Sequence, residues 1–234
     1  MNAIVNYKGK DITYHDLILG KHNMDKFIMQ KNVFKRPDHD FGFMVDSLQP
    51  GDVVYDIGAY IGTFAIPFAL EGMEVHAFEG FPGNYERLKK NCEPYNNITV
   101  HNIAVNNETR KTKTQFNSCT GVPEPVVDVN YHILDDYIKD NNIPLPKLIK
   151  LDIEGMETVA LFGMTNLLET VKPLWQIGYH HNAQSKYSDY PGFVTTKNGG
   201  FDFSTFNKLG YKVHEHRGSS KPFSIFADYY CIPE

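Results

Sequence analysis

The sequence is poor in cysteine, in long apolar runs and in any excess of basic charge. Its three cysteines, Cys92, Cys119 and Cys231, are widely spaced and form no C-x-x-C pair, which argues against a disulfide framework and a cysteine zinc site. No apolar stretch approaches the roughly 18 residues that suggest a membrane span, and the N-terminus turns polar before a signal-peptide core could form. We therefore expect a cytoplasmic protein without membrane insertion.

Charge and length narrow the class of partner. The 234 residues carry 23 basic and 28 acidic side chains, a formal net charge of -5. A general nucleic-acid or anionic-membrane binder needs a concentrated basic surface, so we expect neither partner. A chain of this length can bury one sizeable core without metal or disulfide support. Composition leaves the oligomeric state and the remaining partner open.

Short apolar strands alternate with amphipathic helices after residue 51, a pattern typical of βα units that build a largely parallel sheet. The expected strands are 53–57, 74–78, 98–103, 148–153 and 174–179. The expected helices are 61–71, 83–93, 131–139, 156–168 and a short one at 203–209. The sequence therefore predicts an α/β fold with helices flanking a mostly parallel sheet.

The two ends of the chain and the segments inserted between its core elements do not follow this βα pattern. A polar, glycine-rich insertion is expected at 182–200. After it, strands at 211–214 and 224–231 are close in sequence, are joined by a turn at 218–222, and predict a C-terminal antiparallel hairpin. The proline-bearing segment 111–130 is expected to be an irregular excursion at the sheet edge. Residues 1–50 are expected to form a small extension, itself beginning with a hairpin, that covers the domain 51–234.

A glycine turn between a buried strand and a helix marks a candidate cofactor site. The segment Val53-Val-Tyr-Asp-Ile-Gly-Ala-Tyr-Ile-Gly62 has Asp56 near the end of the strand and glycines spaced G-x-x-x-G. Glycines there let a ligand approach the main chain and the helix amides. Dinucleotide sites use G-x-G-x-x-G and hold a pyrophosphate, which Asp56 would repel. A ligand without phosphate and with positive charge, such as S-adenosylmethionine, fits better.

A second acidic residue supports this interpretation. Glu79 ends the next strand, a little over twenty residues on, where a carboxylate can accept hydrogen bonds from both ribose hydroxyls. Phe81 follows and could lie beside the adenine. The expected cofactor-binding residues are Asp56, Gly58, Ala59, Tyr60, Gly62, Glu79, Gly80, Phe81, Ala104 and Asp152.

The segment Leu148-Ile-Lys-Leu-Asp-Ile-Glu-Gly-Met-Glu157 places charge on a strand that should be central. Strand alternation puts Lys150, Asp152 and Glu154 on one face. A central parallel strand is expected to carry charged side chains only near its carboxyl end, which is also where ligands bind in such sheets. The segment therefore predicts a second part of the same site.

Together these segments resemble the FkbM-type family of S-adenosylmethionine-dependent methyltransferases. The family pattern K-x-D-x-E-G-x-E, followed by a leucine and a glycine, is matched throughout, and the resemblance covers about residues 51–179. Tyr60, Gly80 and Gly178 depart from it, where asparagine, proline and glutamate are common. The resemblance implies a class I methyltransferase fold and O-methylation of a hydroxyl on a sugar, glycan or small natural product.

Methyl transfer to an alcohol requires alignment of the reacting atoms and removal of a proton. The catalytic candidates are Asp152, Glu154 and His180, with Asp152 expected near the methionine moiety and His180 favoured as general base over Asp152, Glu154 and His181. A metal-assisted alternative would use the two acids and one histidine as ligands. We expect no metal, because carboxylates beside a cationic cofactor are already accounted for. A non-catalytic cofactor-binding subunit is the other alternative.

Overall fold

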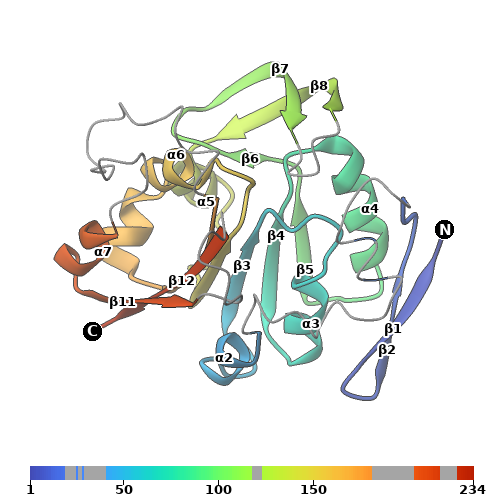
Figure 1. Cartoon of the computed structure of the whole chain (residues 1–234), viewed down its shortest axis with the longest axis horizontal. Helices are drawn as coiled ribbons and strands as arrows, with labels where there is room; N and C mark the ends of the chain where they lie inside the picture. Colours follow the sequence, from blue (N-terminus) through green and yellow to red (C-terminus); the bar gives the residue numbers. More distant parts are fainter. Residues whose placement is uncertain (19–24, 26–27, 29–40, 118–122, 181–202, 217–225) are drawn as a thin grey trace.

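A seven-stranded sheet forms the centre of the molecule, as Figure 1 shows. The computed structural model describes residues 1–18, 25, 28, 41–117, 123–180, 203–216 and 226–234. The strand order is β11-β12-β10-β9-β3-β4-β5. The strands are β3 (Val53–Ile57), β4 (Glu74–Phe78), β5 (Ile98–His101), β9 (Leu148–Leu151), β10 (Leu174–His180), β11 (Tyr211–His216) and β12 (Phe226–Pro233). β3, β4, β5, β9 and β10 are parallel, and β12 pairs antiparallel with both β10 and β11. The expected parallel sheet with a C-terminal antiparallel hairpin is confirmed.

Helices cover both faces of the sheet because strand residues alternate between two apolar clusters. Val54 packs into one cluster and Tyr55 into the other, and Leu148 and Ile149 divide in the same way. The helical segments are α2 (Phe41–Asp46), α3 (Ala65–Leu70), α4 (Pro82–Cys92), α5 (Leu134–Asp140), α6 (Glu157–Phe162), the π-helix η2 (Leu167–Val171) and α7 (Ser204–Lys208). The first cluster includes side chains of α2, α3 and α4, and the second includes side chains of α5, α6, η2 and α7.

Several expected boundaries are wrong. The helix expected at 61–71 begins at Ala65, because positive φ angles at Tyr60 and Gly62 keep the preceding turn non-helical. The helix expected at 156–168 is divided into α6 and η2. The strand expected at 148–153 ends at Leu151.

The segment 111–130 is not an irregular excursion. It contributes most of β7 (Arg110–Asn117) and β8 (Pro123–His132), which pair antiparallel and form a separate three-stranded sheet with β6 (Ala104–Val105). The prolines Pro123 and Pro125 fall at the start of β8, where a missing backbone donor is tolerated. This small sheet lies at the top of Figure 1, beyond the central strands.

The N-terminal residues pack into the core of the domain. β1 (Ala3–Tyr7) and β2 (Lys10–Tyr14) form the expected hairpin, with Val5 opposite Ile12. Both of these side chains are buried in the cluster that contains α3 and α4. Within the described residues, no helix is long and apolar enough to cross a membrane. The expected insertion at 182–200 and the turn at 218–222 lie outside the described residues.

Candidate functional site

The carboxyl ends of β3 and β9 meet where the chain reverses its direction across the sheet. β4 and β5 lie on one side of β3, and β9 and β10 lie on the other. Open α/β sheets bind ligands at such a switch point. The backbone amide of Asp152 donates to the carbonyl of Ile57 at 3.1 Å, so the two predicted motifs are adjacent.

Gly58 allows the two motifs to approach this closely. Its φ angle is 79°, and a Cβ atom added to it would lie 1.9 Å from the carbonyl oxygen of Asp152. That oxygen belongs to the backbone and cannot rotate away. Glycine is therefore required at the turn for steric as well as conformational reasons.

Asp56 lies beneath this turn and is paired with Lys150. Its side chain is fully buried, and the Lys150 ammonium donates to Oδ1 at 2.9 Å and to the carbonyl of Gly58 at 3.1 Å. Burial lowers the pKa of Lys150, but the charges of Asp56 and Asp152 outweigh it and raise that pKa above its ordinary value. Oδ2 of Asp56 has no hydrogen-bond partner among the described residues. The charge of Asp56 is thus largely compensated within the protein.

Glu79 is held by backbone amides at the end of β4. Tyr60 N donates to Oε2 and Phe81 N donates to Oε1, each at 2.9 Å. The side chain is buried, and this burial raises its pKa to about 7 against the opposing effect of the two amides. Gly80 lies against Ala104, where an added Cβ would come within 2.6 Å of the alanine Cβ. Two predicted cofactor residues, Tyr60 and Phe81, therefore bind this carboxylate through their amides, and two more, Gly80 and Ala104, contact each other next to it.

The N-terminal extension reaches this loop through a buried cluster of Asp25, Tyr60 and Arg87. The Tyr60 hydroxyl donates to Asp25 Oδ1 at 2.7 Å, and Arg87 Nη2 donates to both carboxylate oxygens at 3.0 and 2.8 Å. The Arg87 guanidinium also lies 5.2 Å from the centre of the Tyr60 ring. Asp25 is fully buried. The N-terminal extension therefore supports Tyr60, the residue of the glycine turn whose backbone amide donates to Glu79.

The structure separates the acids of the second motif. Asp152 follows β9 directly, and its Cγ lies 3.0 Å from the position of a Cβ added to Gly178. Glu154 does not continue the strand face as expected, because it occupies a turn with a φ angle of 57° and is exposed. Glu157 is fully buried and accepts hydrogen bonds from the amides of Ile153 and Gly155 at 3.0 and 3.1 Å. Glu157 thus holds the turn that carries Glu154.

The histidine candidates are only partly described. His180 is the last residue of β10, at the same carboxyl edge as Asp152, and its backbone pairs with Phe226. His181 lies outside the described residues. No group of three or more histidine, cysteine, aspartate or glutamate side chains that could hold a metal ion occurs in the described ranges.

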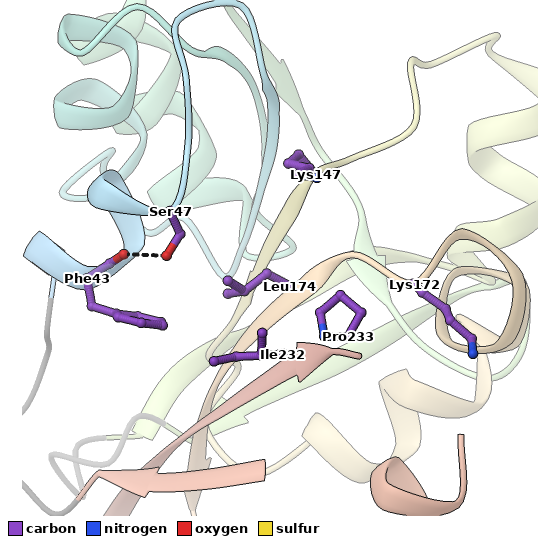
Figure 2. A pocket seen from close by; sticks show the side chains of 7 residues that line it. All are labelled: Phe43, Ser47, Lys147, Lys172, Leu174, Ile232 and Pro233. Atoms are coloured by element: carbon purple, nitrogen blue, oxygen red, sulfur yellow. Dashed lines mark hydrogen bonds between the residues drawn. The ribbon is translucent and has the colours of Figure 1, made fainter. Parts of the chain in front are cut away.

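A cavity of about 390 Å³ lies at the other end of the strands. Figure 2 shows Leu174 and Ile232 at its centre, with Ser47 donating to the carbonyl of Phe43 at 2.7 Å on one side. Leu174 begins β10, whereas the site residues follow the ends of their strands. This cavity is therefore distinct from the candidate site.

Sequence reasoning missed the roles of four buried residues, Asp25, Arg87, Gln176 and Asp228. Gln176 Nε2 donates to Asp228 Oδ1 at 2.7 Å, between the neighbouring strands β10 and β12. Asp25 and Asp228 belong to segments that carry no motif, so only the three-dimensional structure brings them to the site. A polar residue within the apolar strand Leu-Trp-Gln-Ile was the available signal for Gln176.

The sequence matches the model of the methyltransferase FkbM domain across residues 56–213. Over 141 residues it is 26% identical to the hexuronic acid methyltransferase AglP of Haloferax volcanii, covering 55% of this chain and 56% of that protein. Over 47 residues it is 49% identical to the 31-O-demethyl-FK506 methyltransferase FkbM of Streptomyces tacrolimicus, covering 19% of this chain and 18% of that protein.

The fold is similar to that of a crystallised methyltransferase FkbM from Methylobacillus flagellatus. The TM-score is 0.55 at 18% sequence identity, with 88% of this chain and 52% of that chain covered. The present chain therefore spans about half the length of this structure and of the AglP protein.

Proposed function

The chain belongs to the methyltransferase FkbM domain family, and on that premise we propose that it methylates a hydroxyl oxygen of a sugar, a glycan or another small natural product. The fold is that of a class I methyltransferase, and S-adenosylmethionine is the cofactor that family and fold imply, as the sequence predicts. The acceptor and the chemistry of its reactive atom are the proposed part.

The observation that carries the proposal is the meeting of three predicted elements at one edge of the sheet. The Gly58 turn, the buried Glu79 carboxylate and Asp152 lie at the carboxyl ends of β3, β4 and β9. The glycine spacing differs from that of dinucleotide sites, and the acidic side chains of Glu79 and Asp152 suit a cationic ligand without phosphate.

Each residue has a role in the proposed reaction. S-adenosylmethionine supplies an electrophilic methyl group when it is bound. Glu79 would accept hydrogen bonds from the ribose hydroxyls, and Asp152 would lie beside the methionine end. His180, or Asp152 itself, takes the proton of the acceptor hydroxyl. Glu79 is buried and Asp152 is partly buried, which limits the access of water and restricts their orientation, and such exclusion and alignment supply much of the rate enhancement of a transfer of this kind.

The acceptor class is supported by the names of the relatives. AglP is described as acting on a hexuronic acid and the Streptomyces protein as acting on 31-O-demethyl-FK506. Both descriptions point to oxygen-rich small molecules. A metal-assisted reaction and a non-catalytic cofactor-binding role are the two competing proposals.

Mass spectrometry of a reaction with S-adenosylmethionine and extracted metabolites and glycans tests the proposal. We expect S-adenosylhomocysteine together with a product 14 mass units heavier than an oxygen-rich acceptor, in amounts unaffected by EDTA. Loss of turnover with EDTA, restored by Mg²⁺, would favour the metal-assisted reaction. Tight cofactor binding without transfer to any acceptor would favour the binding subunit. Replacing His180 with glutamine should lower kcat while leaving cofactor affinity unchanged.

A further inference from the structure

Gly178 lies near the carboxyl end of β10, between two carboxylates on the neighbouring chain segments. It is directly opposite Asp228 in the antiparallel pair of β10 and β12. Directly opposite residues place their side chains on the same face, with Cβ atoms about 5 Å apart where both are present. On the other side of Gly178, the Asp152 side chain occupies the space that a Cβ would enter, with Oδ2 3.3 Å from that position. Glycine at 178 thus brings two acids from different strands to one spot.

A buried amide fixes one of these acids. Gln176 is fully buried, and its Nε2 donates to Asp228 Oδ1 at 2.7 Å. Its Oε1 has no hydrogen-bond partner among the described residues. Leaving a buried acceptor unpaired costs about 1–3 kcal/mol, so an apolar side chain would be more favourable for stability alone. The glutamine is therefore better explained by the orientation it gives to Asp228.

The position of Asp228 indicates which ligand it meets. It lies near the start of β12, and because β12 is antiparallel to β10 this start lies at the carboxyl end of β10. That is the edge where Asp152 follows the end of β9 and where His180 ends β10. Asp228 is also buried, with 6% of its surface exposed, so any group that reaches it is largely shielded from water.

We propose that Asp228, oriented by Gln176, binds the acceptor hydroxyl next to Asp152 and selects an uncharged acceptor over an anionic one. This inference rests on the proposed function. A carboxylate accepts hydrogen bonds from hydroxyl groups and repels another carboxylate in a shielded site. Lys150, which stands opposite Gln176 on the neighbouring strand β9, is paired with Asp56. A neutral sugar or polyol is therefore the substrate class, and a hexuronate carboxylate is disfavoured.

Kinetics on paired probes test the inference. The panel consists of neutral methyl hexosides and the matching methyl hexuronides, assayed by formation of S-adenosylhomocysteine. We expect the wild type to use at least one neutral member and to have at least a tenfold lower kcat/KM for its uronide. Asp228→Asn keeps the size and one acceptor oxygen, and should lower kcat/KM for the neutral member at least 30-fold with the S-adenosylmethionine Kd unchanged within twofold.

Two further variants separate binding from folding. Gln176→Met should raise the acceptor KM without changing the cofactor Kd or lowering Tm, because it removes only the group that orients Asp228. Asp140→Asn, at an exposed position at the end of α5, is the matched control and should behave as the wild type. A lowered Tm and a weakened cofactor Kd in both Asp228→Asn and Gln176→Met would assign these residues to the fold instead.

The outcomes distinguish this inference from the function on which it rests. Wild-type turnover that persists within threefold in Asp228→Asn overturns the inference alone. A preference for the uronides overturns the proposed selectivity. Cofactor binding by the wild type without turnover of any panel member overturns the proposed sugar acceptor and this inference together.

Discussion

The Nζ atom of Lys150 lies 2.9 Å from Oδ1 of Asp56, and both side chains are buried. The two residues stand opposite each other on the neighbouring strands β9 and β3. The pair therefore joins the two sequence motifs of the site underneath the glycine turn. Because Lys150 also donates to the carbonyl of Gly58, it stabilises the backbone of the glycine turn as well as compensating the charge of Asp56.

Removal of Lys150 should destabilise the fold strongly. Lys150→Met leaves the Asp56 carboxylate buried without its partner, and breaking a buried pair in this way costs about 3–5 kcal/mol. Urea denaturation of the wild type and variant measures this difference in the free energy of unfolding. The double variant Lys150→Met/Asp56→Leu has no unpaired charge and should recover most of the loss. Equal stability of the single and double variants would contradict this account.

The sequence predicts this site incompletely because only part of it is local. The strand ends at Asp56 and Glu79 and the glycine turn follow from spacing along the chain, and the parallel sheet then brings them together. The pairing of Asp56 with Lys150 depends on β3 and β9 being neighbours, although the two residues are 94 positions apart in the sequence. Asp25 and Asp228 depend on how the ends of the chain pack, which no local pattern encodes.

Local chemistry also overrode strand alternation at Glu154. A strand continued to 153 would have placed this residue beside Asp152, as we expected. The backbone amides of Ile153 and Gly155 instead donate to the buried Glu157 carboxylate. That interaction ends the strand early and turns the chain at Glu154, whose φ angle is 57°.

Cofactor affinity should depend on pH through Glu79. Its pKa is raised to about 7 mainly by burial, so the free protein holds this proton at pH 6 and releases it by pH 8. Ribose hydroxyls donate to the ionised form, so affinity should increase as the pH rises through 7, by about tenfold between pH 6 and 8. Isothermal calorimetry measures the effect. Glu79→Gln should show weaker and nearly pH-independent binding, and a pH dependence equal to that of the wild type would exclude Glu79 as its source.

The same raised pKa has an opposite consequence for stability. The folded chain binds the Glu79 proton up to about pH 7, whereas an unfolded glutamate releases it near its ordinary value of 4.5. Stability from this group is therefore greatest below pH 4.5 and is lost as the pH rises through 7. Affinity and stability should thus change in opposite directions over the same pH range in the wild type and in neither direction in Glu79→Gln.

The buried contact between Asp25 and Arg87 should matter more than an exposed contact made by the same segment. Asp25→Ala leaves Arg87 buried and unpaired and releases the Tyr60 hydroxyl. We expect a loss of about 3–5 kcal/mol in the free energy of unfolding and a weaker cofactor affinity at a temperature where the variant is folded.

An exposed pair provides the matched control for Asp25. Asp16 and Lys90 join the N-terminal segment to α4 at 2.8 Å, as Asp25 and Arg87 do, but both are about half exposed. Asp16→Asn, which removes the charge but keeps a side chain tolerated at the positive φ angle of 57°, should cost less than about 1 kcal/mol and leave cofactor affinity unchanged. Equal effects of the two variants would mean that any ion pair between the N-terminal extension and α4 is enough for stability and cofactor affinity. The burial of Asp25 beside Tyr60 would then have no special role.

Comparison of two glycines isolates the steric demand at the cofactor turn. Gly58 and Gly9 have similar φ angles, 79° and 84°, so alanine at either position incurs about 1–2 kcal/mol of left-handed strain. An added Cβ meets nothing within 4 Å at Gly9, but meets the Asp152 carbonyl oxygen at 1.9 Å at Gly58. Gly58→Ala should therefore cost a further 1–3 kcal/mol or so and abolish cofactor binding, because the backbones of the two motifs must separate. Gly9→Ala should bind S-adenosylmethionine as the wild type does, and calorimetry on both variants decides whether this close approach builds the site.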